Sequence, residues 1–357
     1  MGRYSILQLL VIVTAIALVL GLLLPPILKA REDARRMSCR GRLKQLALAI
    51  HNYHSAYQHL PAAMSGNVNN DFRLSGLVWL TPFLEEQALW ESIASPFSSA
   101  GTAYPPMGLP PQDKEYAPWR TQMPSLQCPS DPSWSDRYSR EALRTLAKTN
   151  YAFSVGDRVS DLYACKTLED VRGLFAPYQI TRFNDVSDGL SHTLCFAEIS
   201  TASGKRLQGQ FSIGHPRSLA EDPAKCFLAR DPGRLLFYDS KQELSGLGRG
   251  GAFADGSGGY AMVHTVLPPN APSCAIGETE PYSGVFSAGS YHPGGCNVVL
   301  ADGSVQFVSE TVDFGGPDTL DPSPLRVNTP DGIPIPSPYS VWGALGSRAG
   351  NDEPLCF

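Results

Sequence analysis

The sequence predicts an α+β protein in which a long N-terminal helix, first transmembrane and then amphipathic, packs on an antiparallel, β-rich and loop-rich head. An uncharged apolar run lies near the N-terminus, and apolar residues at helical spacing follow it. Farther along the chain, short β-prone runs alternate with turn signals. The 33 glycines and 30 prolines exceed the average of soluble chains, so much of the head must be turn and loop.

Length and composition exclude several classes of protein. A chain of 357 residues can bury a real core, as one large or two ordinary domains, and is too long for a small disulfide-stapled scaffold. A hydrophobic content of 43% argues against wholesale disorder. The net charge of −5 gives no overall basic field, so we expect no nucleic-acid partner.

Residues 1–25 are predicted to form a membrane anchor. The run from residue 6 to residue 24 has no charge and only two polar side chains. As a helix it would be about 28 Å long, close to the roughly 30 Å hydrocarbon thickness of a bilayer. A cleaved secretory signal is the alternative, but such signals have shorter apolar regions, and Pro25-Pro26 after the run fit a cleavage site poorly. The retained anchor is therefore the preferred interpretation, with the lipid bilayer as its partner.

The helix should continue beyond the membrane, from about Tyr4 to Gln58, so that residues 26–60 pack on the head. Pro25 and Pro26 should kink it, because proline removes a backbone donor and clashes with the preceding turn. Beyond the prolines, one face of the helix carries a periodic row of side chains: Leu43, Leu46, Ala47, Ile50, His54 and Tyr57.

Three histidines near the end of this helix, His51, His54 and His59, raise the question of a metal site. Zinc needs three or four converging ligands, and no carboxylate or cysteine accompanies these histidines at helical spacing. We therefore expect them to pack at the helix end rather than to bind a metal.

The head is assigned to residues 61–312. A short amphipathic helix is predicted over Pro82–Ala94. The dense prolines between Pro96 and Pro132 oppose regular helix and central strand alike. From Thr149 onward the alternation of β-prone runs and turn signals predicts antiparallel strands.

Asp302-Gly303 is the strongest hairpin signal in the chain. Glycine accepts the positive φ that a primed turn demands, so Val298–Leu300 should pair with Val305–Val308. Residues 313–357 are rich in proline, glycine and aspartate, and we expect them to form a tail that closes on the head.

The cysteines are even in number and widely scattered. No two of them form C-x-x-C, which argues against a zinc ribbon or a thioredoxin-type site. Long-loop disulfides in an oxidising compartment and buried free thiols both stay open as interpretations. The eight positions are Cys39, Cys128, Cys165, Cys195, Cys226, Cys274, Cys296 and Cys356.

Several motifs along the chain occur together in one known family. The N-terminus reads Y-S-I-L-Q-L-L-V-I-V, the apolar run ends in L-L-L-P, and A-R-E-D-A-R-R-M-S-C-R follows. Near the C-terminus, His292 is followed after nine residues by Asp302-Gly303. Further motifs are Leu126–Pro132, Thr149–Ala152, Phe183–Leu194 and Arg249–Gly256. With these motifs the chain resembles the planctomycete family of prepilin-like proteins of unknown function, which has also been catalogued as a solute-binding family.

The resemblance implies a type IV pilin-like or type II secretion pseudopilin-like architecture, in which a membrane-born helix carries an exported head. It implies a non-enzymatic, structural or secretion-associated function, with other pilin-like subunits or secretion-system components as partners. The basic residues that cluster after the apolar run, against Arg3 alone before it, favour a cytoplasmic head. The resemblance outweighs this count. We therefore expect a single-pass protein of the cytoplasmic membrane, with its N-terminus inside and its head outside.

The N-terminus departs from the family's processing pattern. In the family a glycine directly precedes the aromatic residue where the prepilin peptidase cuts. Here Tyr4 matches that aromatic residue, but Arg3 stands in the place of the glycine, and Gly2 lies one position early. Gln8 replaces a glutamate that would attract a neighbouring N-terminal ammonium in a low-dielectric medium. The hypothesis is an uncleaved, pilin-like anchor with impaired filament assembly.

Motifs of enzymes are weak, and we expect neither enzymatic activity nor a catalytic residue. Gly246–Gly251 satisfies G-x-G-x-x-G, but no helix that would hold a pyrophosphate is predicted after it, so a mobile loop is the preferred interpretation. His292 and Asp302 are candidates for an acid–base or ligand pair, because the hairpin brings their flanking residues together. A structural role is preferred, with His292 bonding a loop backbone and Asp302 occupying the turn.

No cofactor and no metal are expected, and calcium is the alternative. Asp313, Asp318 and Asp321 lie in a flexible segment. Some pseudopilins, which the chain resembles, hold calcium in a C-terminal loop. The spacing of the three aspartates is not that of an EF-hand.

The alternative function is a membrane-tethered, extracytoplasmic binding module for a solute or a polysaccharide. Its sign would be a concave pocket lined by clustered, exposed tryptophans, whereas scattered and buried tryptophans would favour the structural function. The residues in question are Trp79, Trp90, Trp119, Trp134 and Trp342.

Overall fold

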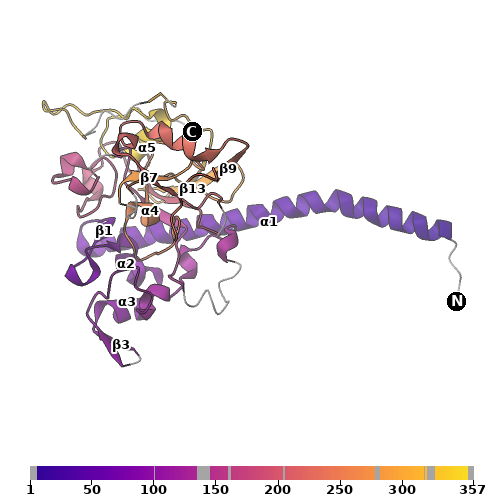
Figure 1. The fold of residues 1–357 in the computed structure, drawn as a ribbon, viewed down its shortest axis with the longest axis horizontal. Coiled ribbons are helices and arrows are strands. Elements are labelled where there is room, and N and C mark those ends of the chain that lie inside the picture. Colours follow the sequence, from indigo (N-terminus) through magenta and orange to yellow (C-terminus); the bar gives the residue numbers. More distant parts are fainter. Residues whose placement is uncertain are drawn as a thin grey trace.

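The computed structural model describes residues 6–99, 101–134, 145–159, 162–203, 206–277, 282–316, 318–319 and 326–352. Helix α1, Ile6–Tyr57, extends as a long stalk from a head that contains the other elements (Figure 1). The α+β prediction is confirmed, because a long apolar helix precedes a sheet-rich head.

Helix α1 has two unlike halves. Between Leu9 and Leu28 the large apolar side chains that the structure describes are 45% to 68% exposed. On the second half, by contrast, Leu43, Leu46 and Ile50 have no exposed surface. The helix is long and apolar enough to cross a membrane, and its most apolar window is not buried by the rest of the protein. One continuous helix therefore carries an exposed apolar half and a half that belongs to the core of the head.

The prolines do not interrupt this helix. It continues as helix through Pro25 and Pro26. The helix as a whole is gently curved rather than sharply kinked (Figure 1). The helix ends at Tyr57, one residue before the expected end. Gln58 enters the left-handed region at φ 62°, and its N–H donates to the carbonyl of His54 at 2.8 Å, which closes the last turn.

The central sheet of the head has five strands in the order β10–β5–β6–β13–β14. Three of its four pairs are antiparallel, as expected, whereas β10 runs parallel to β5. The five strands are β5 (Tyr151–Ser154), β6 (Leu194–Glu198), β10 (Met262–Val263), β13 (Gly295–Leu300) and β14 (Val305–Ser309).

The predicted C-terminal hairpin is confirmed. Strand β13 pairs with β14, with Val299 opposite Val305. Gly303 has φ 86°, but Asp302 does not have a positive φ, so the turn is not of the primed type that needs two such residues. A type I turn that ends in a left-handed glycine fits the observed bond from the Gly303 N–H to the carbonyl of Leu300.

The central sheet is buried on both faces. Phe196 and Val299 lie in one hydrophobic cluster with Ile50 of helix α1. Val298 lies in a second cluster with Trp342 of helix α5, Ser340–Gly346. The stalk helix thus forms one layer of the core, and a short C-terminal helix covers the opposite face of the sheet.

Smaller elements complete the head. A three-stranded sheet, β12–β11–β7, contains a second parallel pair, β11 with β7. Its strands are β7 (Ser212–His215), β11 (Cys274–Ile276) and β12 (Gly284–Val285). Three two-stranded pairs are β1 (Met64–Ser65) with β2 (Leu74–Ser75), β3 (Phe97–Ser99) with β4 (Thr102–Tyr104), and β8 (Arg230–Asp231) with β9 (Arg234–Tyr238). The short helices are α2 (Gly76–Leu80), α3 (Gln87–Ala94) and α4 (Gly258–Ala261).

The single helix predicted over Pro82–Ala94 is wrong. The chain forms a 3₁₀ turn over Thr81–Leu84 and then helix α3 over Gln87–Ala94. Glu85 separates them, because its φ of 65° is left-handed and ends the first turn. Helix α2, directly before this turn, was not expected.

Burial of the second half of α1 should contribute several kcal/mol to the stability of the head. We predict that Leu46→Ala lowers the free energy of unfolding by about 2–5 kcal/mol, because the removed methyl groups leave a cavity in the core. Leu48→Ala is the matched control, since Leu48 lies on the same helix and is 61% exposed. Urea unfolding of the detergent-solubilised chain measures both, and equal losses in the two variants would contradict the packing described.

His264 is a buried, neutral histidine at the end of β10. Its backbone N–H donates to the carbonyl of Phe286 at 2.8 Å, and its Nδ1 accepts the Phe286 N–H at 3.3 Å. Burial lowers the pKa of His264 from 6.5 to about 3, and the charge of Arg249 adds to the effect. The folded protein therefore holds this imidazole uncharged at pH values where the unfolded chain protonates it.

This histidine predicts that acid destabilises the head. Because the pKa is lower in the folded state, its contribution is fully present above pH 6.5 and is lost as the pH falls from 6.5 towards about 3. The slope reaches about 1.4 kcal/mol per pH unit. His264→Asn keeps an acceptor for the Phe286 N–H but does not titrate, so its unfolding free energy should fall less over the same range. Parallel pH dependence of wild type and variant in urea unfolding would disprove this role.

Candidate functional site at the joint of helix α1 and the head

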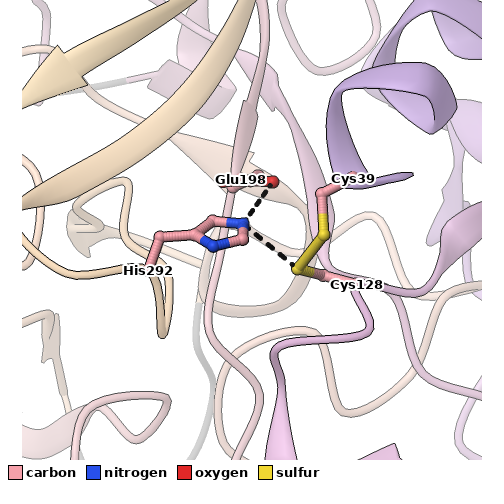
Figure 2. Close-up of side chains that lie close together, drawn as sticks. All are labelled: Cys39, Cys128, Glu198 and His292. Carbon is pink, nitrogen blue, oxygen red and sulfur yellow. Dashed lines mark hydrogen bonds and ion pairs between the residues drawn. A yellow bond between two sulfur atoms is a disulfide. The ribbon is translucent and has the colours of Figure 1, made fainter. Parts of the chain in front are cut away.

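A buried cluster of side chains joins helix α1 to the head (Figure 2). Cys39 comes from α1, Cys128 from a proline-rich loop, Glu198 from the end of β6, and His292 from the loop before β13. All four are buried, and one ligand-type atom of each lies within 4.8 Å of the others. Four segments that are distant in sequence therefore converge on one small volume.

Local structure explains how these segments reach the cluster. The loop that carries Cys128 follows a 3₁₀ turn at Pro124–Leu126, and the Cys128 N–H donates to Asn150 Oδ1 at 2.8 Å. Glu198 ends a strand whose register sets it opposite Tyr151 of β5. The His292 N–H donates to Ser290 Oγ at 3.1 Å, which fixes the loop before β13.

Two bonds link α1 to this cluster. Cys39 and Cys128 form a disulfide across 89 residues of sequence. Seven residues before Cys39, and thus on the same face of the helix, Glu32 accepts a bond from His292 Nδ1 at 2.6 Å. Ser130 Oγ also donates to Glu32, at 2.9 Å, and Arg35 forms an ion pair with it. The stalk is therefore held to the head both covalently and through a charged hydrogen bond.

The imidazole of His292 lies between two carboxylates. Its Nε2 is 3.6 Å from Glu198 Oε1 and 3.6 Å from Cys128 Sγ (Figure 2). Burial lowers the pKa of His292, but the bonds and negative charges of Glu198 and Glu32 outweigh it and raise this pKa above its ordinary value. For Glu32, burial raises the pKa, and hydrogen bonds from His292, Arg35 and Ser130 overcome it and lower the pKa.

Glu198 is oriented by its own partner. Asn297 of β13 donates its backbone N–H to Glu198 Oε2 at 2.7 Å, and its Nδ2 donates to both oxygens at 3.0 and 3.1 Å. The cluster thus offers imidazole, carboxylate and cysteine sulfur, which are the side-chain types that hold zinc in proteins once the sulfurs are reduced.

The alternative in which His292 and Asp302 form an acid–base or ligand pair is wrong. They lie at opposite ends of β13, because a strand of six residues separates them. Asp302 is exposed in the turn and accepts the Ser304 N–H at 2.8 Å, which agrees with the predicted turn role. His292, however, bonds carboxylates through its ring rather than a loop backbone. Gly303 gives the turn its positive φ.

The histidines at the end of α1 pack as predicted. The rings of His51 and His54 lie 4.7 and 4.6 Å from the ring of Phe183. His51 Nε2 also donates to the carbonyl of Ala301 in the hairpin turn, at 3.0 Å. His59 contacts the ring of Tyr53 at 5.8 Å.

The residues assigned to processing and to calcium are only partly described. Residues 1–5, with Gly2, Arg3 and Tyr4, lie outside the described residues, and Gln8 is exposed on α1. Asp313 accepts bonds from the Gly315 N–H and from Ser340 Oγ, at 3.1 and 2.5 Å. Asp318 is exposed, and Asp321 lies outside the described residues. Calcium binding therefore stays an untested alternative to the expectation of no metal.

The glycine-rich segment Gly246–Gly251 is not the expected mobile loop. Gly248 and Gly250 have positive φ and are buried, and a Cβ on Gly250 would lie 2.0 Å from the carbonyl oxygen of Thr149. Arg249 between them is buried and donates to carbonyls of the following segment, Gly258–Met262. Close packing of the backbone, rather than mobility, accounts for these glycines.

The tryptophans do not line one pocket. Trp119 and Trp342 are buried in separate clusters on opposite sides of the central sheet. Trp79 and Trp90 are half-buried neighbours, with ring centroids 5.8 Å apart. The side chain of Trp134 lies outside the described part of the chain.

Sequence reasoning found only part of the cluster. His292 was selected by its motif, and Cys39 and Cys128 were noted without a pairing. Glu198 was missed, although a carboxylate within the apolar run L-C-F-A-E-I is a signal of a buried, partnered charge. Glu32 was missed as well, and its spacing of seven residues from Cys39 is a weaker signal. Both interpretations of the cysteines apply to part of the set. Cys226 and Cys274 form a second disulfide, whereas Cys195 and Cys296 are buried free thiols.

One comparison with known proteins identifies a family. The model of a family described as "Protein of unknown function (DUF1559)" matches residues 28–315. The searches of curated proteins and of solved structures found no match. The matched region covers most of the chain and includes all the residues of the cluster. The chain therefore belongs to this family.

Proposed function

We propose that this member of the family is a non-enzymatic, membrane-anchored protein of the pilin-like or pseudopilin-like type, with a structural or secretion-associated function. Helix α1 is its anchor and its contact with neighbouring subunits, and the head lies outside the cytoplasmic membrane. No catalytic residue and no nucleic-acid partner belong to this proposal.

The observation that carries the proposal is the division of helix α1. Its large apolar side chains from Leu9 to Leu28 are exposed, which water would oppose and a bilayer or a bundle of similar helices would favour. The same helix then enters the core of the head without a break. A helix that is lipid-embedded in its first half and a core element in its second half is the arrangement that the pilin-like resemblance implies.

Disulfides and arginine contacts support an extracytoplasmic head. Two disulfides are typical of an oxidising compartment. Some of the basic residues after the apolar run, whose number favours a cytoplasmic head, contact the head. Arg36 lies 3.4 Å over the ring of Phe307, and Arg40 Nη2 donates to the carbonyl of Val305 at 3.1 Å. These two arginines therefore have a structural role that does not depend on topology.

A groove beside helix α1 supports the alternative, a tethered binding module for a solute or a polysaccharide. It has a volume of about 390 Å³, within the range of small-molecule sites, and Leu48, Phe83 and Pro124 contribute to its walls. Arg42 and Glu86 give it charge of both signs. A binding module needs no second copy of the chain, so the cross-linking experiment described next separates the two functions.

Contact between stalks should be detectable in native membranes. We predict that a photo-cross-linking residue in place of Leu18, which is 65% exposed on α1, joins two copies of the chain or the chain and a secretion component. The control is the same substitution at Leu235, which is 67% exposed on β9 of the head. Products are separated by size and identified by mass spectrometry. Cross-links to lipid alone at Leu18 would contradict assembly and favour the binding module.

Topology can be tested at an exposed position of the head. Val68 is 75% exposed, so Val68→Cys should react with a membrane-impermeant thiol reagent in intact cells. Wild type, whose described cysteines are buried or disulfide-bonded, is the control. Labelling that appears only after cell lysis would assign the head to the cytoplasm and contradict this part of the proposal.

A further inference from the structure

We propose that Cys39, Cys128, His292 and Glu198 bind one zinc ion when the Cys39–Cys128 disulfide is reduced. A disulfide by itself requires neither a buried imidazole nor a buried carboxylate beside it. Here both are present, all four side chains are buried, and their donor atoms lie within 4.8 Å of one another (Figure 2). Two thiolates, one imidazole and one carboxylate form a complete tetrahedral donor set for zinc.

The distances around His292 Nε2 support a shared metal ion. The 3.6 Å to Glu198 Oε1 is long for a hydrogen bond. In a tetrahedral site, ordinary zinc–ligand bond lengths separate nitrogen from oxygen by about 3.4 Å and nitrogen from sulfur by about 3.6 Å. The observed separations, 3.6 Å to Glu198 and 3.6 Å to Cys128 Sγ, are close to both values.

Residues around the cluster bond the proposed ligands and hold them in orientation, as residues around metal sites usually do. In zinc sites the second ring nitrogen of a histidine ligand usually donates to a carboxylate, which fixes the tautomer and the ring orientation. His292 Nδ1 donates to Glu32 Oε1 at 2.6 Å, which leaves Nε2 directed at Glu198 and the sulfurs. Asn297 orients the carboxylate of Glu198 in the same way, through its N–H and its Nδ2. Glu32 and Asn297 are therefore positioning residues.

The conversion of the disulfide form into the zinc-bound form balances in atoms, protons and electrons. A dithiol reductant transfers two electrons and two protons to the Cys39–Cys128 disulfide. The reductant becomes a cyclic disulfide, and Cys39 and Cys128 become thiols. Zinc then replaces the two thiol protons and, where the imidazole is protonated, the Nε2 proton of His292, and all of these protons are released to solvent. The two sulfur atoms separate to about 3.8 Å, the edge of a tetrahedron with zinc–sulfur bonds of about 2.3 Å. In both forms the stalk stays joined to the head.

The first measurement compares the two redox states of the full chain in detergent. The protein is reduced with dithiothreitol without oxygen, freed of reductant, incubated with zinc and passed through a gel-filtration column. We expect one zinc per reduced chain by elemental mass spectrometry, and none per oxidised chain. A reduced chain that retains no zinc, or an oxidised chain that retains as much, overturns the proposal.

Variants test the assignment of ligands. His292→Ala and Glu198→Gln should lose the bound zinc, and Glu32→Gln should lower the zinc affinity of the reduced chain about 10- to 100-fold. The matched control is Cys226→Ser with Cys274→Ser, which removes the other disulfide and should leave one zinc per chain. Unchanged zinc affinity in His292→Ala would assign the ion to another site and refute this one.

A measurement on the wild type avoids any variant that fails to fold. Zinc should slow the alkylation of Cys39 and Cys128 in the reduced chain by at least tenfold, because bound thiolates are shielded. Cys195 is a buried thiol outside the cluster and serves as an internal control whose rate should not depend on zinc. Peptide mass spectrometry follows each residue separately, and equal rates for Cys39 and Cys128 with and without zinc would refute the site.

Discussion

Glu32 and Cys39 bond helix α1 to the head, and these bonds fix the point along the helix at which it emerges from the head. Before Glu32 the large apolar side chains are exposed, and after Cys39 one face of the helix is buried in the core. The change of environment is completed within two helical turns. Without a joint at this level, the helix could shift along its axis relative to the head, because apolar side chains continue on both sides of the joint.

The central sheet depends on the same helix. Its α1-facing cluster combines residues of the sheet with Leu43, Leu46 and Ile50, so the sheet has no complete core without the stalk. The β13–β14 hairpin adds polar contacts along the stalk, through the Ala301 carbonyl to His51 and through the Phe307 ring to Arg36. The anchor and the head are consequently one cooperative structure rather than two modules on a linker.

The parts that were predictable from sequence are those with a local signal. Periodicity predicted helix α1, and Asp302-Gly303 predicted the hairpin, because both depend on neighbouring residues. The break at Glu85 was missed because a non-glycine residue in the left-handed region has no clear signature in sequence. The cluster around His292 was beyond reach, since its members come from segments up to 260 residues apart and only the tertiary fold brings Glu32 to His292.

The position of the Cys39–Cys128 disulfide has a consequence for the response of the protein to proteolysis. The bond closes a loop between these two residues, which are 89 positions apart. This loop includes the hairpin β3–β4. A protease that cuts once inside this loop leaves both fragments covalently linked, so the rest of the head remains attached to helix α1. Shedding of the head would need a second event, the reduction of that bond.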